Sequence, residues 1–247
     1  MTFDRPLLLD GAMGTALGCP THAPAASLDR DAEVRLVHRS FVEAGADLLL
    51  TNTFAGSAPT LAECEASLRL ARRAGAPFLG AALWAGLPPR ELAQAARALA
   101  GVDVLWLETA TNVSQAFAAL KAVKGLGKVV VTFGFSAQGE PAGRRALEML
   151  LAEGASAVGF NCSPWPREPG GLARLAHSLS DLPLVLKPDA VGMAPEAWAS
   201  EVAGAAAAGA RFVGGCCGAT GLHLAALKRE LDRRTFSQTL PKPPQER

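Results

Sequence analysis

The chain lacks a long hydrophobic run, a charge imbalance and a regular cysteine framework, and each absence excludes a class of protein. No stretch of its 247 residues approaches about 18 uninterrupted apolar positions, the length that a membrane-spanning helix requires. The formal net charge of +1 gives no reason to expect nucleic acid or an anionic membrane surface as a partner. Five cysteines without regular spacing do not make a disulfide scaffold in a chain of this length. We therefore expect a small-molecule partner and reduced thiols.

The first residues also lack the pattern of a secretory signal. Residues 1–9 include Asp4 and Arg5, and their apolar run is too short for a signal segment. Together with the missing membrane span, this predicts a cytoplasmic protein.

What the sequence does contain is a regular alternation of short apolar runs and helical patterns. Eight apolar runs are expected to be strands, at residues 6–10, 47–54, 77–83, 102–107, 128–135, 155–162, 183–187 and 210–216. Eight helices are expected between and after them, at residues 31–45, 59–75, 90–101, 112–125, 143–154, 170–180, 195–209 and 222–234.

This alternation predicts an α/β protein with the (β/α)8 TIM barrel fold in a single domain, for which about 250 residues is the typical length. An open doubly wound sheet is the alternative architecture. The barrel is expected to occupy residues 1–235, and the proline-rich and charged residues 236–247 are expected to form a loose or docked tail.

Several polar and thiol residues stand where the predicted strands end. Because barrel active sites lie at the C-terminal ends of the strands, we expect these residues in one neighbourhood. They are Asp10, Thr51, Asn52, Thr53, Glu108, Asn161, Cys162, Asp189, Cys216 and Cys217.

The three cysteines of this group have the composition of a metal site. Cys162 ends one predicted strand, and Cys216 with Cys217 ends another. Zinc prefers tetrahedral sulfur and nitrogen ligands and, in reactive sites, keeps a fourth position for substrate. A vicinal disulfide between Cys216 and Cys217, or two buried apolar thiols, are the alternatives.

A metal held by three thiolates is a weak Lewis acid, but it keeps a coordinated substrate thiol deprotonated. The pattern therefore favours attack by a substrate thiol on an electrophilic carbon, with no catalytic group required beyond the metal site. Asp10 and Glu108 are candidates to hold a substrate ammonium, although a salt bridge or a loop cap would also explain them. Backbone amides of residues 11–15 are candidates to bind a carboxylate.

Four segments and a cysteine pair together carry a family resemblance: Asp10-Gly11-Ala12-Met13-Gly14-Thr15, Thr51-Asn52-Thr53-Phe54, Glu108-Thr109, Gly159-Phe160-Asn161-Cys162, and Gly214-Gly215-Cys216-Cys217-Gly218. In this order they resemble the homocysteine S-methyltransferase family. That family includes betaine-, S-methylmethionine- and S-adenosylmethionine-dependent enzymes and the homocysteine domain of cobalamin-dependent methionine synthase.

The resemblance implies roles for individual residues. It implies an eight-stranded barrel with zinc bound by Cys162, Cys216 and Cys217, and with the homocysteine sulfur as a further ligand. Glu108 matches the family's ammonium-binding glutamate. The remaining matches to the substrate site are Asp10, Gly11, Thr51, Asn52, Thr53 and Asn161.

The chain departs from the family pattern in three places that concern the methyl donor. The family's glycine-rich loop and longer insertion after the third strand are replaced by residues 80–89, which pass quickly into a helix. Lys187-Pro188-Asp189 stands where an aromatic residue, proline and asparagine are usual, and the chain has no tyrosine.

The sequence thus predicts zinc-dependent transfer of a methyl group to L-homocysteine, giving methionine, with S-methylmethionine or S-adenosylmethionine as the donor. One alternative is the homocysteine-activating subunit of a split methionine synthase, with a separate cobalamin-carrying protein as partner. The others are a non-catalytic zinc- or thiol-binding barrel and a redox switch through Cys216 and Cys217.

Overall fold

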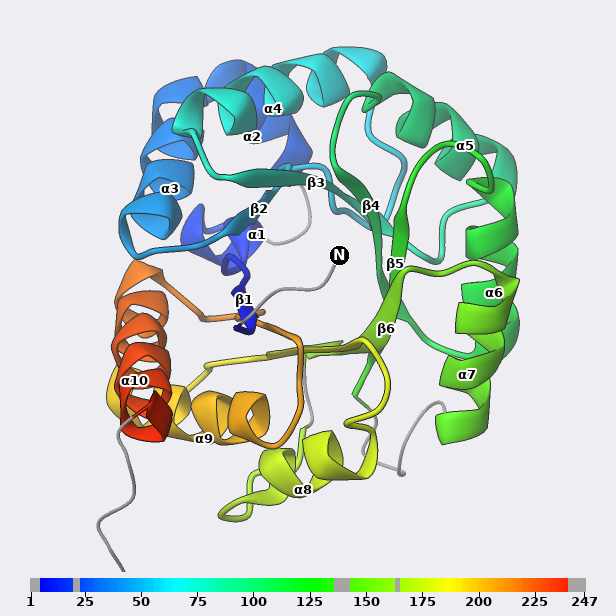
Figure 1. Ribbon diagram of the computed structural model, residues 1–247. Helices are drawn as coiled ribbons and strands as arrows, with labels where there is room; N and C mark the ends of the chain where they lie inside the picture. Colours follow the sequence, from blue (N-terminus) through cyan, green and yellow to red (C-terminus); the bar gives the residue numbers. More distant parts are fainter. Residues whose placement is uncertain (1–4, 20–22, 136–142, 163–164, 240–247) are drawn as a thin grey trace, which may run out of the picture.

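The computed structural model describes residues 5–19, 23–135, 143–162 and 165–239. Within these ranges the chain forms a TIM barrel, with parallel strands in a ring and helices around it (Figure 1). The strands are β1 (Leu7–Leu8), β2 (Leu48–Leu50), β3 (Phe78–Trp84), β4 (Val104–Ala110), β5 (Val129–Gly134), β6 (Ala157–Cys162), β7 (Leu184–Pro188) and β8 (Phe212–Val213). The predicted fold class is confirmed.

The strands pair in the order β1-β8-β7-β6-β5-β4-β3-β2, all in parallel. A single bridge between Leu9 and Leu48 joins β1 to β2 and completes the ring. Closure leaves no long unpaired edge and gathers the C-terminal ends of all eight strands at one mouth.

Eight helices cover the outside of the barrel: α3 (Asp31–Glu43), α4 (Leu61–Ala74), α5 (Pro89–Ala98), α6 (Val113–Ala122), α7 (Arg144–Glu153), α8 (Gly171–Ser178), α9 (Pro195–Ala207) and α10 (Gly221–Thr239). Three short elements precede α3, namely α1 (Met13–Ala16), the 3-10 helix η1 (Ala23–Ala25) and α2 (Ala26–Asp29). The sequence did not predict these three.

Local sequence signals explain several helix ends. Thr60 begins α4 with a capping box, in which its side chain accepts the Glu63 amide and the Glu63 carboxylate accepts the Thr60 amide. Gly75 ends this helix with φ of 79°, a backbone conformation that glycine adopts without steric cost.

The barrel interior is filled mainly by aliphatic side chains, and the fully buried indole of Trp106 on β4 packs with them. A second and larger apolar layer packs the helices against the outside of the sheet. This division follows from strand alternation, since successive side chains of a strand point to opposite faces.

His38, on α3, is a buried exception in the outer layer. Its side chain is fully buried, and neither ring nitrogen has a hydrogen-bond partner within the described parts of the chain. Burial lowers the pKa of His38 to about 4, because the imidazolium ion would lose its hydration without gaining a partner.

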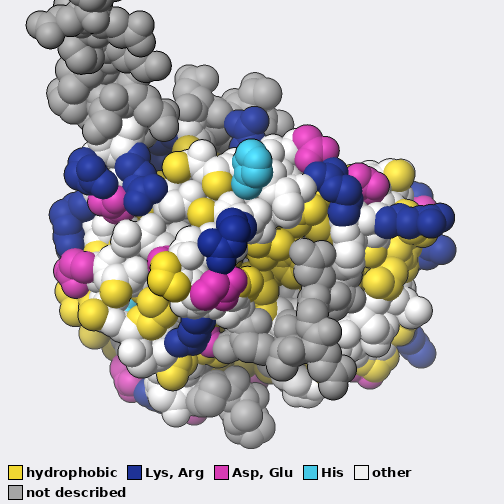
Figure 2. All heavy atoms as spheres, turned by 90° about the horizontal axis from the view of Figure 1, so that it is seen from below, with side chains coloured by type: hydrophobic (Ala, Val, Ile, Leu, Met, Phe, Trp, Pro, Cys, Tyr) yellow, Lys and Arg dark blue, Asp and Glu magenta, His cyan; other side chains and the backbone are white. Residues whose placement is uncertain are grey.

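The surface shown in Figure 2 carries Lys and Arg side chains interspersed with Asp and Glu, without a continuous field of one sign. Such mixing is ordinary for a chain with a formal charge of +1. Among the described helices, none combines the length and the apolar character needed to cross a membrane.

The observed element bounds differ from the predicted ones mainly at the site end of the barrel. The second and eighth strands are shorter than predicted, because the residues after Leu50 and Val213 leave the sheet to form the mouth loops. The last helix runs to Thr239 instead of ending at Arg234. The first proline after it is Pro241, so the helix can continue further than predicted. Residues 240–247 of the predicted tail lie outside the described chain, and the division at residue 235 stays a prediction.

Candidate active site

The three cysteines come from two strands that flank a third. Cys162 ends β6, Cys216 and Cys217 follow β8, and β7 lies between those strands. The backbone at the end of β7 forms hydrogen bonds with both cysteine segments. The Asp189 amide donates to the Cys162 carbonyl at 3.1 Å, and the Ala190 amide donates to the Cys217 carbonyl at 2.8 Å. The Cys216 amide completes the connection by donating to the carbonyl of Pro188 at 3.0 Å.

The three sulfur atoms converge, as the strand ends predict. All lie within 4.8 Å of one another, and the Cys162 and Cys217 sulfurs are 3.7 Å apart. Zinc–sulfur bonds of about 2.3 Å in a tetrahedron place two sulfurs about 3.8 Å apart, so this spacing fits a shared zinc ion. None of the five cysteines takes part in a disulfide bond.

Strained backbone holds two of the residues around the sulfurs. Cys162 has φ of 70° and Thr109 has φ of 60°, positions in the left-handed region that non-glycine residues rarely adopt. Such residues persist where the surroundings fix them, and they concentrate at functional sites. Thr109 lies at an irregularity of β4 where the register to β5 shifts.

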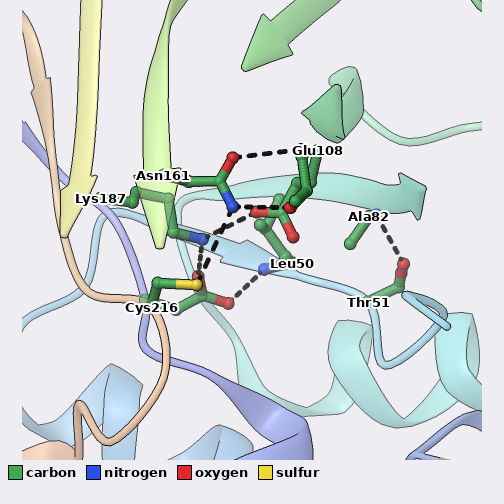
Figure 3. Close-up of polar contacts among 9 residues, drawn as sticks. Leu50, Thr51, Ala82, Glu108, Asn161, Lys187 and Cys216 are labelled. Carbon is green, nitrogen blue, oxygen red and sulfur yellow. Dashed lines mark hydrogen bonds and ion pairs between the residues drawn. The ribbon is translucent and has the colours of Figure 1, made fainter. Parts of the chain in front are cut away.

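Asn161 fixes this irregularity and reaches the thiol cluster. Its Oδ1 accepts the Thr109 amide at 3.1 Å, and its Nδ2 donates to the Thr109 hydroxyl at 2.8 Å (Figure 3). The same Nδ2 lies 3.9 Å from the Cys216 sulfur as a donor. Asn161 therefore ties the end of β4 to the sulfur of Cys216 across the barrel mouth.

Without a metal, two of the clustered thiols, Cys216 and Cys217, have raised pKa values. Contact with Cys162, together with burial, raises the pKa of Cys216 to about 12. For Cys217 the contact with Cys162 lowers the pKa, but contact with Cys216 and burial outweigh it and raise the pKa to about 11. A bound cation would have the opposite effect on the pKa of these thiols, because a coordinating thiol is deprotonated outright.

A buried ion cluster lies beside the sulfurs. The Lys187 ammonium, from β7, is 3.1 Å from Asp10 Oδ1 and 3.3 Å from Glu108 Oε1 (Figure 3). Burial raises the pKa of both carboxyl groups, and the nearby ammonium opposes that shift. Burial alone would lower the pKa of Lys187, but the charges of Glu108 and Asp10 outweigh it and raise the pKa. Cys216 also contributes to this increase, which places Lys187 within electrostatic range of the thiols.

A cavity of about 200 Å³ connects the ion cluster with the sulfurs. Its walls include 20 residues. Nine of the predicted site residues are among them, together with Lys187 and Thr109; the nine are Asp10, Gly11, Thr51, Asn52, Glu108, Asn161, Cys162, Cys216 and Cys217.

Of the residues predicted for this neighbourhood, Thr53 and Asp189 do not line the cavity. At about 30 Å³ per water molecule, the cavity has room for about seven waters, which is the size of a small amino acid. A larger hollow of about 470 Å³ opens at the opposite end of the barrel. Its described walls contain none of the cysteines, so the smaller cavity is the candidate site.

The segment after β2 supports the cavity through hydrogen bonds. The Thr51 hydroxyl accepts the Ala82 amide at 3.2 Å and lies 2.6 Å from the Thr53 hydroxyl, which donates to the Ala82 carbonyl. Asn52 donates through Nδ2 to the Ala23 carbonyl and to Ser27. Its Oδ1 is buried without a partner in the described chain. Thr53 is thus a support for the site and not part of its wall.

Gly11 lines the cavity where two loops approach closely. A Cβ atom at this position would lie 2.4 Å from the Ala219 carbonyl oxygen and 3.0 Å from the Phe41 ring. The absence of a side chain therefore lets the loop after β1 pack against the loop that carries Cys217.

Asp189, expected in the same neighbourhood, is turned away from the cavity. Its carboxylate pairs with Arg167 and accepts the indole N–H of Trp165 at 3.1 Å. Trp165 is buried by this contact. Both residues brace the outer side of the loop after β7. The two remaining thiols lie outside this cluster: Cys64 is buried on α4, and Cys19 lies partly buried in the loop after α1.

Sequence reasoning missed two residues of this wall, Lys187 and Thr109. A signal for Lys187 was present, because a lysine inside the apolar run of β7 must be paired when it is buried. Thr109 gave no comparable signal, since its role follows from the backbone irregularity of β4.

The comparisons with known proteins agree with this geometry. The family model for homocysteine S-methyltransferase matches residues 7–82 and 90–231. The match is interrupted at residues 83–89, from the last residues of β3 to the start of α5. No curated protein matched the sequence.

Among solved structures, the homocysteine methyltransferase MmuM from Escherichia coli is similar in its apo form, with 27% identity and a TM-score of 0.72. That alignment covers 92% of this chain and 96% of MmuM. The metallated form of MmuM gives 25% identity and a TM-score of 0.73 over the same shares of the two chains. The carboxyl transferase domain of Rhizobium etli pyruvate carboxylase, at 16% identity and a TM-score of 0.62, shares the fold alone, covering 96% of this chain and 47% of that one. Because the family model matches most of the chain, the protein belongs to the homocysteine S-methyltransferase family.

Proposed function

We propose that the protein transfers a methyl group to the thiol of L-homocysteine and forms methionine, with zinc held by Cys162, Cys216 and Cys217. The observation that carries the proposal is the convergence of three thiols within 4.8 Å at one end of a cavity that also holds buried carboxylates. Membership of the family supports the acceptor, and the similarity to MmuM supports a methyltransferase.

When bound, zinc would supply the deprotonation of the acceptor thiol, because coordination stabilises the thiolate at neutral pH. The chain's own residues place the acceptor. The cavity orients it between the cysteines and the Asp10, Glu108 and Lys187 cluster, and Asn161 holds the Cys216 sulfur in position.

The reaction that we propose forms one bond and breaks another. The acceptor sulfur attacks the methyl carbon of a sulfonium donor, and the donor carbon–sulfur bond breaks with its electron pair going to the donor sulfur. The donor becomes a neutral thioether, and the thiol proton has already been released on binding. We propose S-methylmethionine or S-adenosylmethionine as the donor, and the cytoplasm as the compartment, because the site requires reduced thiols.

The remaining predicted residues are proposed to serve the acceptor. Asp10, Gly11, Glu108 and Asn161 line the part of the cavity that receives it, and Thr51 and Asn52 complete the wall with support from Thr53. These roles follow from the family resemblance and from the positions of the residues around the cavity.

The test is methionine formation by zinc-loaded protein supplied with L-homocysteine and, in parallel, S-methylmethionine, S-adenosylmethionine, betaine or methylcobalamin. Turnover with either sulfonium supports the proposal. Turnover with methylcobalamin alone would replace it with the homocysteine-activating half of a split methionine synthase. No turnover with any of the four donors would favour a non-catalytic zinc- or thiol-binding barrel.

Cysteine variants test the proposed metal site in the same assay. Cys162→Ala, Cys216→Ala and Cys217→Ala should each reduce bound zinc from about one equivalent to near zero and abolish turnover. The matched control is Cys64→Ala, which removes a thiol on α4 outside the cluster and should keep its zinc. Full zinc content in all three cluster variants would refute the site.

A further inference from the structure

The Lys187 ammonium occupies the space between the two carboxylates of the cavity. It is 3% exposed and bridges Asp10 and Glu108 through contacts of 3.1 and 3.3 Å. It also lies 5.7 Å from the centre of the Trp106 ring, whose face attracts cations. Three separate interactions therefore hold this ammonium in one place.

The bridge and one backbone amide engage three of the four oxygens of the two carboxylates. Asp10 accepts Lys187 with Oδ1 and the Leu50 amide with Oδ2, at 2.7 Å, so both of its oxygens are engaged. Glu108 accepts Lys187 with Oε1. Of the four carboxylate oxygens, only Glu108 Oε2 makes no hydrogen bond within the described chain.

The charges of this cluster also disfavour the binding of a ligand ammonium. Two carboxylates and one ammonium leave a single net negative charge in a buried site. A ligand ammonium that approached Glu108 Oε2 would lie beside the Lys187 ammonium, and repulsion between like charges at low dielectric would offset much of its attraction to Glu108. The chain itself thus supplies one cation to this pair of carboxylates before any ligand binds.

We propose that Lys187 is a specificity-determining residue that makes acceptor binding nearly independent of an α-amino group. This inference rests on the proposed function, since it concerns the acceptor of the same site. The acceptor class is then a small thiol acid with or without an amino group. L-homocysteine and its analogue without the amino group, 4-sulfanylbutanoate, are its two representatives.

The experiment measures the binding of both thiols to zinc-loaded protein by calorimetry, without a methyl donor. The quantity compared is the ratio of the Kd for 4-sulfanylbutanoate to the Kd for L-homocysteine. We expect a ratio below about ten in the natural chain. We expect the ratio to rise at least tenfold in Lys187→Gln, which removes the charge but keeps a hydrogen-bond donor. Lys187→Arg keeps the charge, so it is the matched control and should retain the natural ratio.

A ratio above ten in the natural chain would overturn the inference, and so would an unchanged ratio in folded Lys187→Gln. If that variant does not fold, the ratio in the natural chain decides alone. Binding of neither thiol to the zinc-loaded chain would overturn the proposed function and the inference with it. That outcome differs from strong selection for L-homocysteine, which would overturn the inference alone.

Discussion

The buried imidazole of His38 should make the stability of this barrel fall at mildly acidic pH. The pKa of His38 is about 4 in the folded chain and about 6.5 when the ring is exposed in the unfolded chain. Between these values the unfolded state binds more protons than the folded state, so the free energy of unfolding decreases as the pH falls from 6.5 to 4. Above pH 6.5 the ring is neutral in both states, and this dependence disappears.

The magnitude follows from the difference between the two pKa values. A shift of 2.5 units corresponds to about 3.4 kcal/mol once the pH is below 4, at about 1.36 kcal/mol per unit. At pH 5 the loss is about 2 kcal/mol. A second cost does not depend on pH, because the ring nitrogens are buried without partners, and an unsatisfied polar group costs about 1–3 kcal/mol.

His38→Leu removes both costs while keeping a side chain of similar size. We expect the variant to be more stable than the natural chain by about 1–3 kcal/mol at pH 7, and by about 2 kcal/mol more at pH 5. Urea denaturation of both proteins at pH 7 and pH 5 measures this, because carboxylates that titrate in both proteins cancel in the difference. The exposed His177 gives the control, since His177→Leu should not change the pH dependence. An equal loss of stability between pH 7 and pH 5 in His38→Leu and the natural chain would refute the reasoning.

Two further substitutions test the loops and the helix ends. Gly11→Ala should lower stability by about 1–3 kcal/mol and weaken acceptor binding, because its Cβ would meet the Ala219 carbonyl oxygen at 2.4 Å. Gly56→Ala has no atom within 4 Å of the new Cβ and is the control, and equal effects of both substitutions in denaturation and calorimetry would contradict the argument. Thr60→Ala removes the capping box of α4 and should lower the free energy of unfolding by about 1 kcal/mol without changing zinc content, so a parallel loss of zinc would contradict a purely local role.

The sequence was sufficient to predict the barrel and the convergence of the cysteines. Both depend on a single regularity, the alternation of apolar runs and helical patterns. Once that alternation is recognised, the C-terminal ends of the strands must meet at one mouth. Cys162 and Cys216 could therefore be placed together although 53 residues separate them in the chain.

The finer arrangement of the site could not be predicted, because it depends on side-chain directions and on local backbone irregularities. The direction of Thr53 toward Ala82 follows from hydrogen bonds between β2 and β3. Cys162 has a left-handed backbone, and its sulfur lies 3.7 Å from that of Cys217; the spacing of the cysteines in the sequence predicts neither detail. The sequence shows that Lys187 departs from the family pattern. Its bridge to Asp10 and Glu108 could not be predicted, because it depends on how the ends of three strands are arranged in space.

The backbone hydrogen bonds between the loop after β7 and both cysteine segments make the thiol cluster preorganised. The spacing between the Cys162 and Cys217 carbonyls is fixed by the Asp189 and Ala190 amides, so it does not depend on a shared ion. In zinc fingers, by contrast, much of the binding energy of the metal drives folding. Here the barrel has its own apolar core, so the free energy of metal binding is not needed to fold the chain. If zinc binds here as proposed, its loss should leave the site inactive while the fold persists, so that metal supply would control the activity of an already folded chain.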